Sequence, residues 1–77
     1  MIDAKVREIL GRDFGLDGNL AADEKLFSSG KLDSLSSLNL LMSLEGEFGV
    51  KISPLDISID DIDSIEQITV TVDRLTA

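Results

Sequence analysis

The amino-acid sequence predicts an all-α fold, a four-helix bundle with a long first loop and one short helix. Apolar residues recur at gaps of three and four over residues 2–14, 34–48 and 64–76, as they do along one face of an amphipathic helix. Turn-forming residues separate these segments. The chain has 77 residues, which is the size of one small domain, so we expect a single domain over residues 1–77.

The first helix is expected over residues 2–14, and a long loop follows it. The predicted core face of this helix consists of Ile2, Val6, Ile9, Leu10 and Phe14. Gly15 is a suitable stop for the helix. Residues 15–33 are rich in Gly, Asp, Asn and Ser, which form turns, and a long loop in a compact domain is usually functional. We expect this loop to be pinned to the core by its apolar residues, which are Leu16, Leu20, Leu26 and Phe27.

The central helix is expected over residues 34–48, with Asp33 as its N-cap and Gly49 at its end. Its predicted core stripe consists of Leu38, Leu41, Leu44, Glu45 and Phe48, and the residues that widen this stripe are Leu35, Leu40 and Met42. So many apolar positions indicate a helix that is contacted on two sides. For Leu35 and Met42 a place in the core is favoured over the alternative, which is exposure as docking contacts.

The last third of the chain contains two candidate helices. Residues 55–63 alternate between apolar and polar, which favours a strand, but a lone strand would have nothing to pair with. We therefore expect a loop and a short helix near residues 59–63. Residues 64–76 have helical spacing at Ile65, Ile68, Val72 and Leu75. Ser64 and Gln67 form a capping box, which outweighs the strand preference of the β-branched run over residues 68–72.

Composition excludes several classes of function. The chain has 7 basic and 15 acidic residues, a net charge of −8, so nucleic-acid phosphates and anionic membranes would repel it. It has no Cys and no His, so it lacks a thiolate and the commonest acid–base group. No apolar run is long enough to cross a membrane. We expect a cytoplasmic protein with no catalytic residues, no nucleic-acid partner and no membrane insertion.

A cluster of acidic residues near the C-terminus has two interpretations. Its members are Asp56, Asp60, Asp61, Asp63 and Glu66. They lack the glycine and the spacing of a calcium loop. We expect a solvated acidic face without a bound metal, and the alternatives are a surface that attracts basic partners and a weak divalent-ion site.

The candidate site is Ser34, which stands in the first turn of the central helix, directly after a loop that contains Gly30. A helix N-terminus has unpaired N–H groups and a partial positive charge, so a phosphate is favoured there. Asp33 can cap the helix and can also help to place a metal-bound cofactor. An Asp-Ser pair at a helix start is ordinary capping in many proteins, so this dipeptide alone carries little weight.

The residues around Ser34 strengthen this interpretation. The chain has Leu26-Phe27, Gly30, Leu32-Asp33-Ser34-Leu35, Leu38, Leu40, Leu44-Glu45, Phe48, Ile52 and Pro54, followed by the weaker matches Ile65, Ile68 and Leu75. In this it resembles the acyl, peptidyl and D-alanyl carrier protein family, whose freestanding members depend on phosphopantetheine. The resemblance covers essentially the whole chain. It implies a single carrier domain with a right-handed four-helix bundle of the acyl-carrier type.

The resemblance also implies a function. A phosphopantetheinyl transferase would move phosphopantetheine from coenzyme A to Ser34, with Asp33 and Leu35 beside it at the cofactor site. The thiol of this covalent arm would hold an acyl or aminoacyl group as a thioester. Further implied partners are an adenylating ligase or acyltransferase that loads the arm, and a downstream synthase or transferase. The chain itself would not be an enzyme, because the chemistry would belong to the cofactor and the partners.

The central helix is the main docking surface that the resemblance implies. The candidate docking residues are Leu35, Ser36, Asn39, Met42, Ser43 and Gly46. Fatty-acid carriers usually have acidic residues along this face, whereas here it is neutral. This favours specialised or nonribosomal-peptide-type biosynthesis, or aminoacyl transfer, over ordinary fatty-acid synthesis. A fatty-acid carrier, a non-enzymatic acidic helical adaptor and a small calcium or magnesium sensor are the alternatives.

Overall fold

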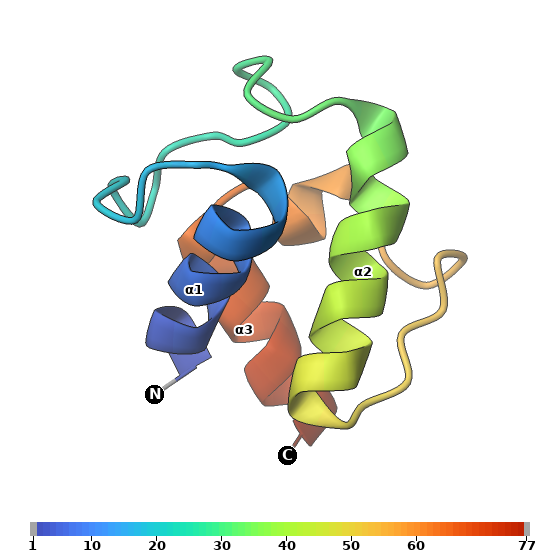
Figure 1. Cartoon of the computed structure of the whole chain (residues 1–77). Coiled ribbons are helices and arrows are strands. Elements are labelled where there is room, and N and C mark those ends of the chain that lie inside the picture. Colours follow the sequence, from blue (N-terminus) through green and yellow to red (C-terminus); the bar gives the residue numbers. More distant parts are fainter. Residues whose placement is uncertain (1, 77) are drawn as a thin grey trace.

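A computed structural model describes residues 2–76, and these residues are helical or looped throughout (Figure 1). The chain forms α1 (Ile2–Phe14), α2 (Ser34–Phe48), the 3₁₀ helix η1 (Ile59–Ile62) and α3 (Ile65–Thr76). The prediction of an all-α fold is confirmed. The predicted count of four helices is reached only with η1, because residues 2–76 contain three α-helices. A segment of this length closes a single tight turn, for which 3₁₀ geometry is common.

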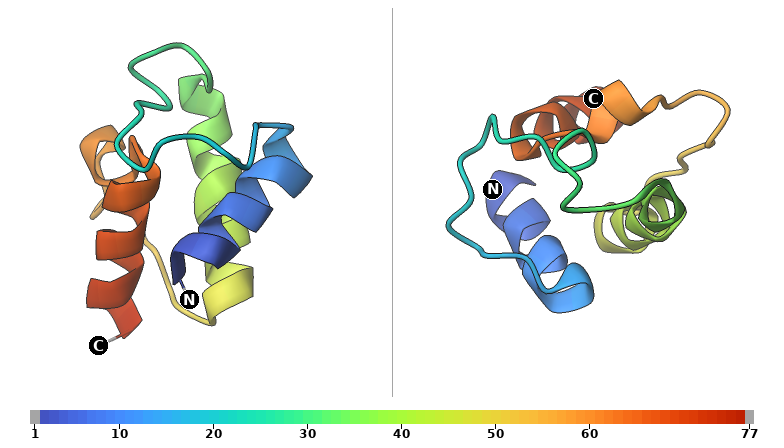
Figure 2. Two further views of the ribbon diagram at one scale, coloured as in Figure 1. Left: turned by 90° about the vertical axis from the view of Figure 1, so that its left-hand side faces the viewer. Right: turned by 90° about the horizontal axis from the view of Figure 1, so that it is seen from above.

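The helices pack around one core, and the long first loop closes one end of the bundle (Figure 2). In Figure 1 the N-terminal ends of α2 and α3 and the turn of η1 lie at the top, where residues 15–33 cross above α1. The described ends of the chain and the C-terminal end of α2 lie at the opposite end. Ser34 begins α2, so the candidate site lies at the end that the first loop covers.

The core is aliphatic and draws on every helix and both long loops. The residues buried in it are Val6, Ile9, Leu10, Leu26, Leu32, Leu40, Leu41, Leu44, Ile52, Ile62, Ile65, Ile68 and Val72. The expected pinning of the first loop is confirmed, because Leu26 is fully buried and Leu16, Leu20 and Phe27 pack against the core. Burial of Leu26 and Leu32 fixes both ends of the loop segment that leads to Ser34.

The prediction of which α2 residues face the core is wrong in part. Leu40, Leu41 and Leu44 are buried, whereas Leu38 is 50% exposed. Leu35 and Met42, for which the core was favoured, are 78% and 67% exposed. Both α1 and α3 contact α2, and they cover one side of a helix that is apolar on nearly all sides.

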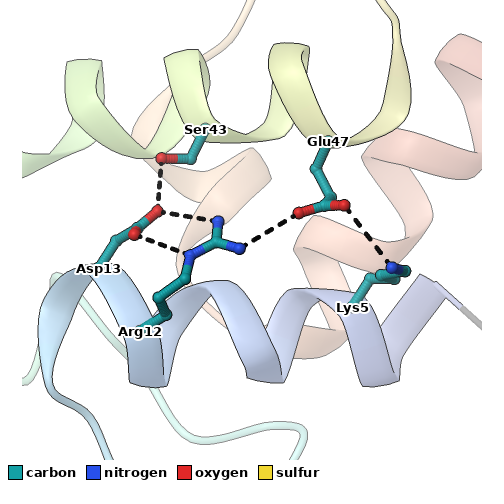
Figure 3. A network of polar contacts seen from close by, with 5 residues as sticks. All are labelled: Lys5, Arg12, Asp13, Ser43 and Glu47. Atoms are coloured by element: carbon teal, nitrogen blue, oxygen red, sulfur yellow. Dashed lines mark hydrogen bonds and ion pairs between the residues drawn. The ribbon is translucent and has the colours of Figure 1, made fainter.

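Polar contacts hold the first loop and α2 against α1. The Arg7 guanidinium donates hydrogen bonds to the carbonyl oxygens of Gly18 (2.9 Å) and Leu20 (2.6 Å). Between α1 and α2, Glu47 pairs with Lys5 (3.6 Å) and Arg12 (3.5 Å), as Figure 3 shows. These contacts are at the side of the bundle, so they fix α2 without occupying its N-terminus.

Among residues 2–76, no helix is long and apolar enough to cross a membrane.

Candidate functional site

Asp33 caps α2 and positions Ser34 as the first helical residue. Its backbone is extended, with φ −94° and ψ 170°, as an N-cap requires. The Asp33 carboxylate accepts hydrogen bonds from the backbone N–H and from the hydroxyl of Ser36, both at 2.9 Å. These two bonds hold the pKa of Asp33 below its ordinary value. The cap is therefore a carboxylate at neutral pH, and the exposed Ser34 follows it directly.

A tight turn before Asp33 directs the chain into α2. The N–H of Gly30 donates to the carbonyl oxygen of Phe27 at 3.1 Å, and the N–H of Leu32 donates to that of Leu26 at 2.8 Å. Gly30 has φ +86°, a conformation that other residues seldom adopt. A Cβ at Gly30 would meet nothing within 4 Å. The need for glycine here is therefore conformational and not a matter of space.

Asp63, between η1 and α3, holds the loop beside Ser34. One carboxylate oxygen accepts the backbone N–H groups of Leu26 (3.1 Å), Phe27 (2.7 Å) and Ser28 (3.0 Å). The other accepts the Ser28 hydroxyl. Burial acts to raise the pKa of Asp63, but the hydrogen bonds from Ser28, Phe27 and Leu26 outweigh it and hold this pKa below its ordinary value. The loop is thus anchored to the far end of the chain by a buried anion.

The place of Asp63 corrects the expected solvated acidic face. Asp63 is only 2% exposed, whereas Asp56, Asp60 and Glu66 are exposed as expected. Sequence reasoning had no signal that separated Asp63 from its acidic neighbours, because its partners lie 35 to 37 residues earlier in the chain. Within residues 2–76, no group of three or more acidic side chains is arranged to hold a metal ion.

A pocket of about 430 Å³ opens directly beside Ser34. It lies between the first loop, the start of α2 and η1, and its lining residues are Phe27, Ser28, Gly30, Leu32, Asp33, Ser34 and Ile59. The apolar side chains that line it are those of Phe27, Leu32 and Ile59, and the other lining residues are polar or glycine. The sequence indicated Phe27 as a core contact of the loop and Ser34 as the candidate site. It did not indicate Ile59, because the place of Ile59 beside the pocket depends on how η1 packs.

The exposed face of α2 continues from Ser34 as an apolar stripe. Leu35, Leu38 and Met42 are all exposed, and their spacing places them on one side of the helix. Among the predicted docking residues, Leu35, Asn39, Met42 and Gly46 are exposed. Ser36 and Ser43 are half-buried.

The two half-buried serines already have partners within the chain. The Ser36 hydroxyl donates to Asp33. The Ser43 hydroxyl donates to Asp13 of α1 at 2.9 Å (Figure 3). Exposed Leu38, which was assigned to the core, joins the stripe instead.

This geometry suits a covalent phosphate-linked group. The Ser34 hydroxyl is accessible, it stands where α-helical N–H groups have no partner in the preceding turn, and it adjoins an open pocket. A carboxylate next to a phosphate is unfavourable because both are negatively charged. Here the Asp33 carboxylate is turned toward the N–H of Ser36. The residues at the start of α2 therefore fit a group attached through Ser34.

Comparison with known proteins agrees with this geometry. Residues 4–72 match the protein family described as "Phosphopantetheine attachment site". The chain is also 34% identical over 74 residues to the D-alanyl carrier protein of Streptococcus pyogenes serotype M5 (strain Manfredo), an alignment that covers 96% of this chain and 94% of that protein. The D-alanyl carrier proteins of S. pyogenes serotypes M49 (strain NZ131) and M1 align with the same identity and coverage.

Proposed function

Because the chain belongs to the phosphopantetheine attachment-site family, we propose that Ser34 is the residue that carries the phosphopantetheine arm. The chain is a carrier protein with this covalent cofactor, and it is not itself an enzyme. When attached, the arm supplies a terminal thiol that holds the cargo as a thioester. The observation that carries the assignment of Ser34 is its exposed position as the first residue of α2, beside an open pocket.

Attachment of the arm forms one new covalent bond to this chain. The Ser34 hydroxyl oxygen forms the new bond to phosphorus, its proton passes to a base of the transferase, and the nucleotide half of coenzyme A leaves. Asp33 remains ionised because Ser36 holds its pKa low, and it directly precedes Ser34 in the chain. A carboxylate in this place can help to hold the metal ion that accompanies coenzyme A in the transferase. The partner in this step is a phosphopantetheinyl transferase.

We further propose that residues 1–77 form a single carrier domain, since one core draws on all helices. Its cargo is an aminoacyl or specialised acyl group, which an adenylating ligase loads onto the arm and a downstream transferase or synthase removes. Two observations support this cargo. The relatives are D-alanyl carrier proteins, and residues 34–44 of α2 contain no charged residue.

The docking surface for these partners is the exposed stripe of α2. The stripe consists of Leu35, Leu38 and Met42, and the exposed residues Asn39 and Gly46 extend the docking surface beyond it. Exposed apolar side chains next to a reactive group are typical of contact sites. Ser36 and Ser43 border this surface, but their hydroxyls are engaged by Asp33 and Asp13, so we expect them to contribute less.

Intact-mass spectrometry tests the assignment of Ser34. Purified chain is treated with coenzyme A and a broad-specificity phosphopantetheinyl transferase, together with Ser34→Ala and the control Ser29→Ala, which removes an exposed serine of the preceding loop. We expect one added arm on the wild type and on Ser29→Ala, and none on Ser34→Ala. A wild type that stays unmodified with several transferases, or a Ser34→Ala protein that is modified, would sink the proposal.

The identity of the cargo is tested on the chain that already carries the arm, with a panel of adenylating ligases and their acids. We expect an aminoacyl thioester, and we expect Met42→Ser and Leu35→Ser to slow its formation. Val70→Ser, a change at an exposed residue of α3, is the control and should leave loading unchanged. Efficient loading with long-chain fatty acids and none with amino acids would contradict this assignment.

A further inference from the structure

The pocket beside Ser34 has a role that attachment alone does not require. It lies against the attachment residue itself, and its walls are the apolar side chains of Phe27, Leu32 and Ile59. We propose that this pocket is a non-covalent docking site for the pantoyl unit of the chain's own arm. The inference rests on the proposed attachment at Ser34, because the tether selects the occupant.

The order of groups along the arm identifies the pantoyl unit. Phosphate is bonded to Ser34, the pantoyl unit with its two geminal methyl groups comes next, and the amide-linked segments and the thiol follow. The cargo begins at the far end of the arm. A pocket whose wall includes Ser34 and Asp33 therefore meets the pantoyl unit before it can meet any cargo.

The chemistry of the pocket matches that unit. The two methyl groups are apolar and would contact Phe27 and Ile59, which are only partly covered in the free chain. The pantoyl hydroxyl and amide are polar and would face Ser28 and Asp33, which are polar residues of the pocket lining. Because the ligand is tethered at the pocket, its local concentration is high and weak contacts are enough to populate the docked state.

The walls of the pocket are held in place before any arm arrives. Asp63 binds the N–H groups of Phe27 and Ser28, and Leu32 is buried in the core. On the opposite side, the backbone N–H and hydroxyl of Ser58 donate to Asp61 (3.0 and 3.3 Å) at the start of η1, and Ile59 follows. A site whose walls are fixed in advance loses little freedom when it binds.

Nuclear magnetic resonance of the chain with its arm attached tests this docking. The chain has three Phe, no Trp and no Tyr, and among these rings only Phe27 lines the pocket. We expect the pantoyl methyl resonances to shift upfield from their positions in free pantetheine. We also expect cross-relaxation between these methyl groups and the side chains of Phe27 and Ile59.

Two variants separate docking from a general effect on the fold. Phe27→Leu keeps an apolar wall and removes the ring, so the upfield shift should vanish while contacts to Ile59 remain. Ile59→Ser, at a residue that is already 37% exposed, should abolish those contacts and return the methyl resonances toward their free positions. Val70→Ser, on the exposed side of α3, is the control and should change neither.

The outcomes distinguish this inference from the function on which it rests. A chain that shows no added mass at Ser34 would overturn both. A chain that carries the arm but whose pantoyl methyl groups resonate as in free pantetheine, without contacts to Phe27 or Ile59, would overturn docking alone. Methyl shifts that persist unchanged in Ile59→Ser and Phe27→Leu would place the arm elsewhere and would also overturn it.

Discussion

Replacing Asp63 by alanine should destabilise the fold through the loop that lies beside Ser34. The N–H of Leu26 would keep a partner, because it also donates to the Asp63 carbonyl oxygen at 2.7 Å. The N–H groups of Phe27 and Ser28 would lose their acceptor. A buried donor without a partner costs about 1–3 kcal/mol. Since water can reach this part-buried loop, we expect a total loss of about 2–4 kcal/mol.

That loss is large for a domain of this size. At about 0.05–0.15 kcal/mol per residue, a chain of 77 residues has a free energy of unfolding of about 4–12 kcal/mol. Asp63→Asn is the matched control, because its amide oxygen can still accept from the three N–H groups. It should lose only the charge-assisted part of these bonds, about 1 kcal/mol.

The pH dependence gives a second measurement of the same anchor. The folded chain holds the pKa of Asp63 below its ordinary value, so the unfolded chain takes up this proton first as acid is added. The stabilisation by the Asp63 charge is therefore complete above about pH 4 and is lost as pH falls through the lower folded pKa. Wild type and Asp63→Asn should converge in stability over that acidic range.

Urea unfolding followed by circular dichroism measures both effects. The midpoint should fall in the order wild type, Asp63→Asn, Asp63→Ala, with similar slopes because a similar surface is exposed. An Asp63→Ala protein within about 0.5 kcal/mol of the wild type would refute the reasoning. A difference between wild type and Asp63→Asn that stays constant from neutral pH to pH 3 would refute its electrostatic part.

Three further predictions test the packing, the cap and the contact between helices, each by urea unfolding. Leu44→Ala, which removes a fully buried side chain of α2, should cost about 2–5 kcal/mol, whereas Leu35→Ala at an exposed position should cost under about 0.5 kcal/mol; equal losses would mean that α2 faces the core differently. Asp33→Ala should lower the midpoint more than Asp33→Asn, which keeps a capping oxygen, and the reverse order would contradict the cap. Glu47→Gln, which breaks the ion pairs to Lys5 and Arg12, should cost at most about 1 kcal/mol, and this cost should shrink in high salt; a cost that salt leaves unchanged would show that packing and not charge is lost.

The helices could be predicted from the sequence because their signals are local. The spacing of Ile2, Val6 and Ile9 and the glycine at position 15 set the first helix, and the structure has it at Ile2–Phe14. Ser64 was expected to cap the last helix, and its hydroxyl accepts the N–H of Gln67 at 3.1 Å. A cap, a stop and a period of 3.6 all lie within one short segment, so no knowledge of the rest of the chain was needed.

The side of α2 that faces the core could not be predicted in the same way. Periodicity selects a face only when the other faces are polar. In α2 the apolar residues Leu35, Leu38, Leu40, Leu41 and Met42 surround the helix, so the choice depends on where α1 and α3 pack. The exposed stripe is thus visible only in the folded chain.

The polar surroundings of the site depend on contacts across the whole chain. Asp63 and Ser28 are 35 residues apart, and Ile59 reaches the pocket only because η1 packs beside the first loop. Ser34 itself could be proposed from its motif and its place at a helix start. Its pocket could not, because its walls combine residues of the first loop with Ile59 of η1, which is distant in the sequence.

The charge of the chain explains how the apolar stripe of α2 can be exposed to partner enzymes without making two copies of the chain associate. Residues 34–44 carry no charge, whereas the whole chain has a net charge of −8. Two copies that approached stripe to stripe would bring their acidic surfaces within about a Debye length, roughly 8–10 Å at physiological salt, and would repel each other. Lys5 and Arg12 are paired with Glu47 in the same chain (Figure 3), so they are not free to pair with acidic residues of a second copy. A partner enzyme with a basic rim around an apolar patch is attracted by the same charges, so the charges that disfavour self-association favour the encounters that the proposed arm on Ser34 requires.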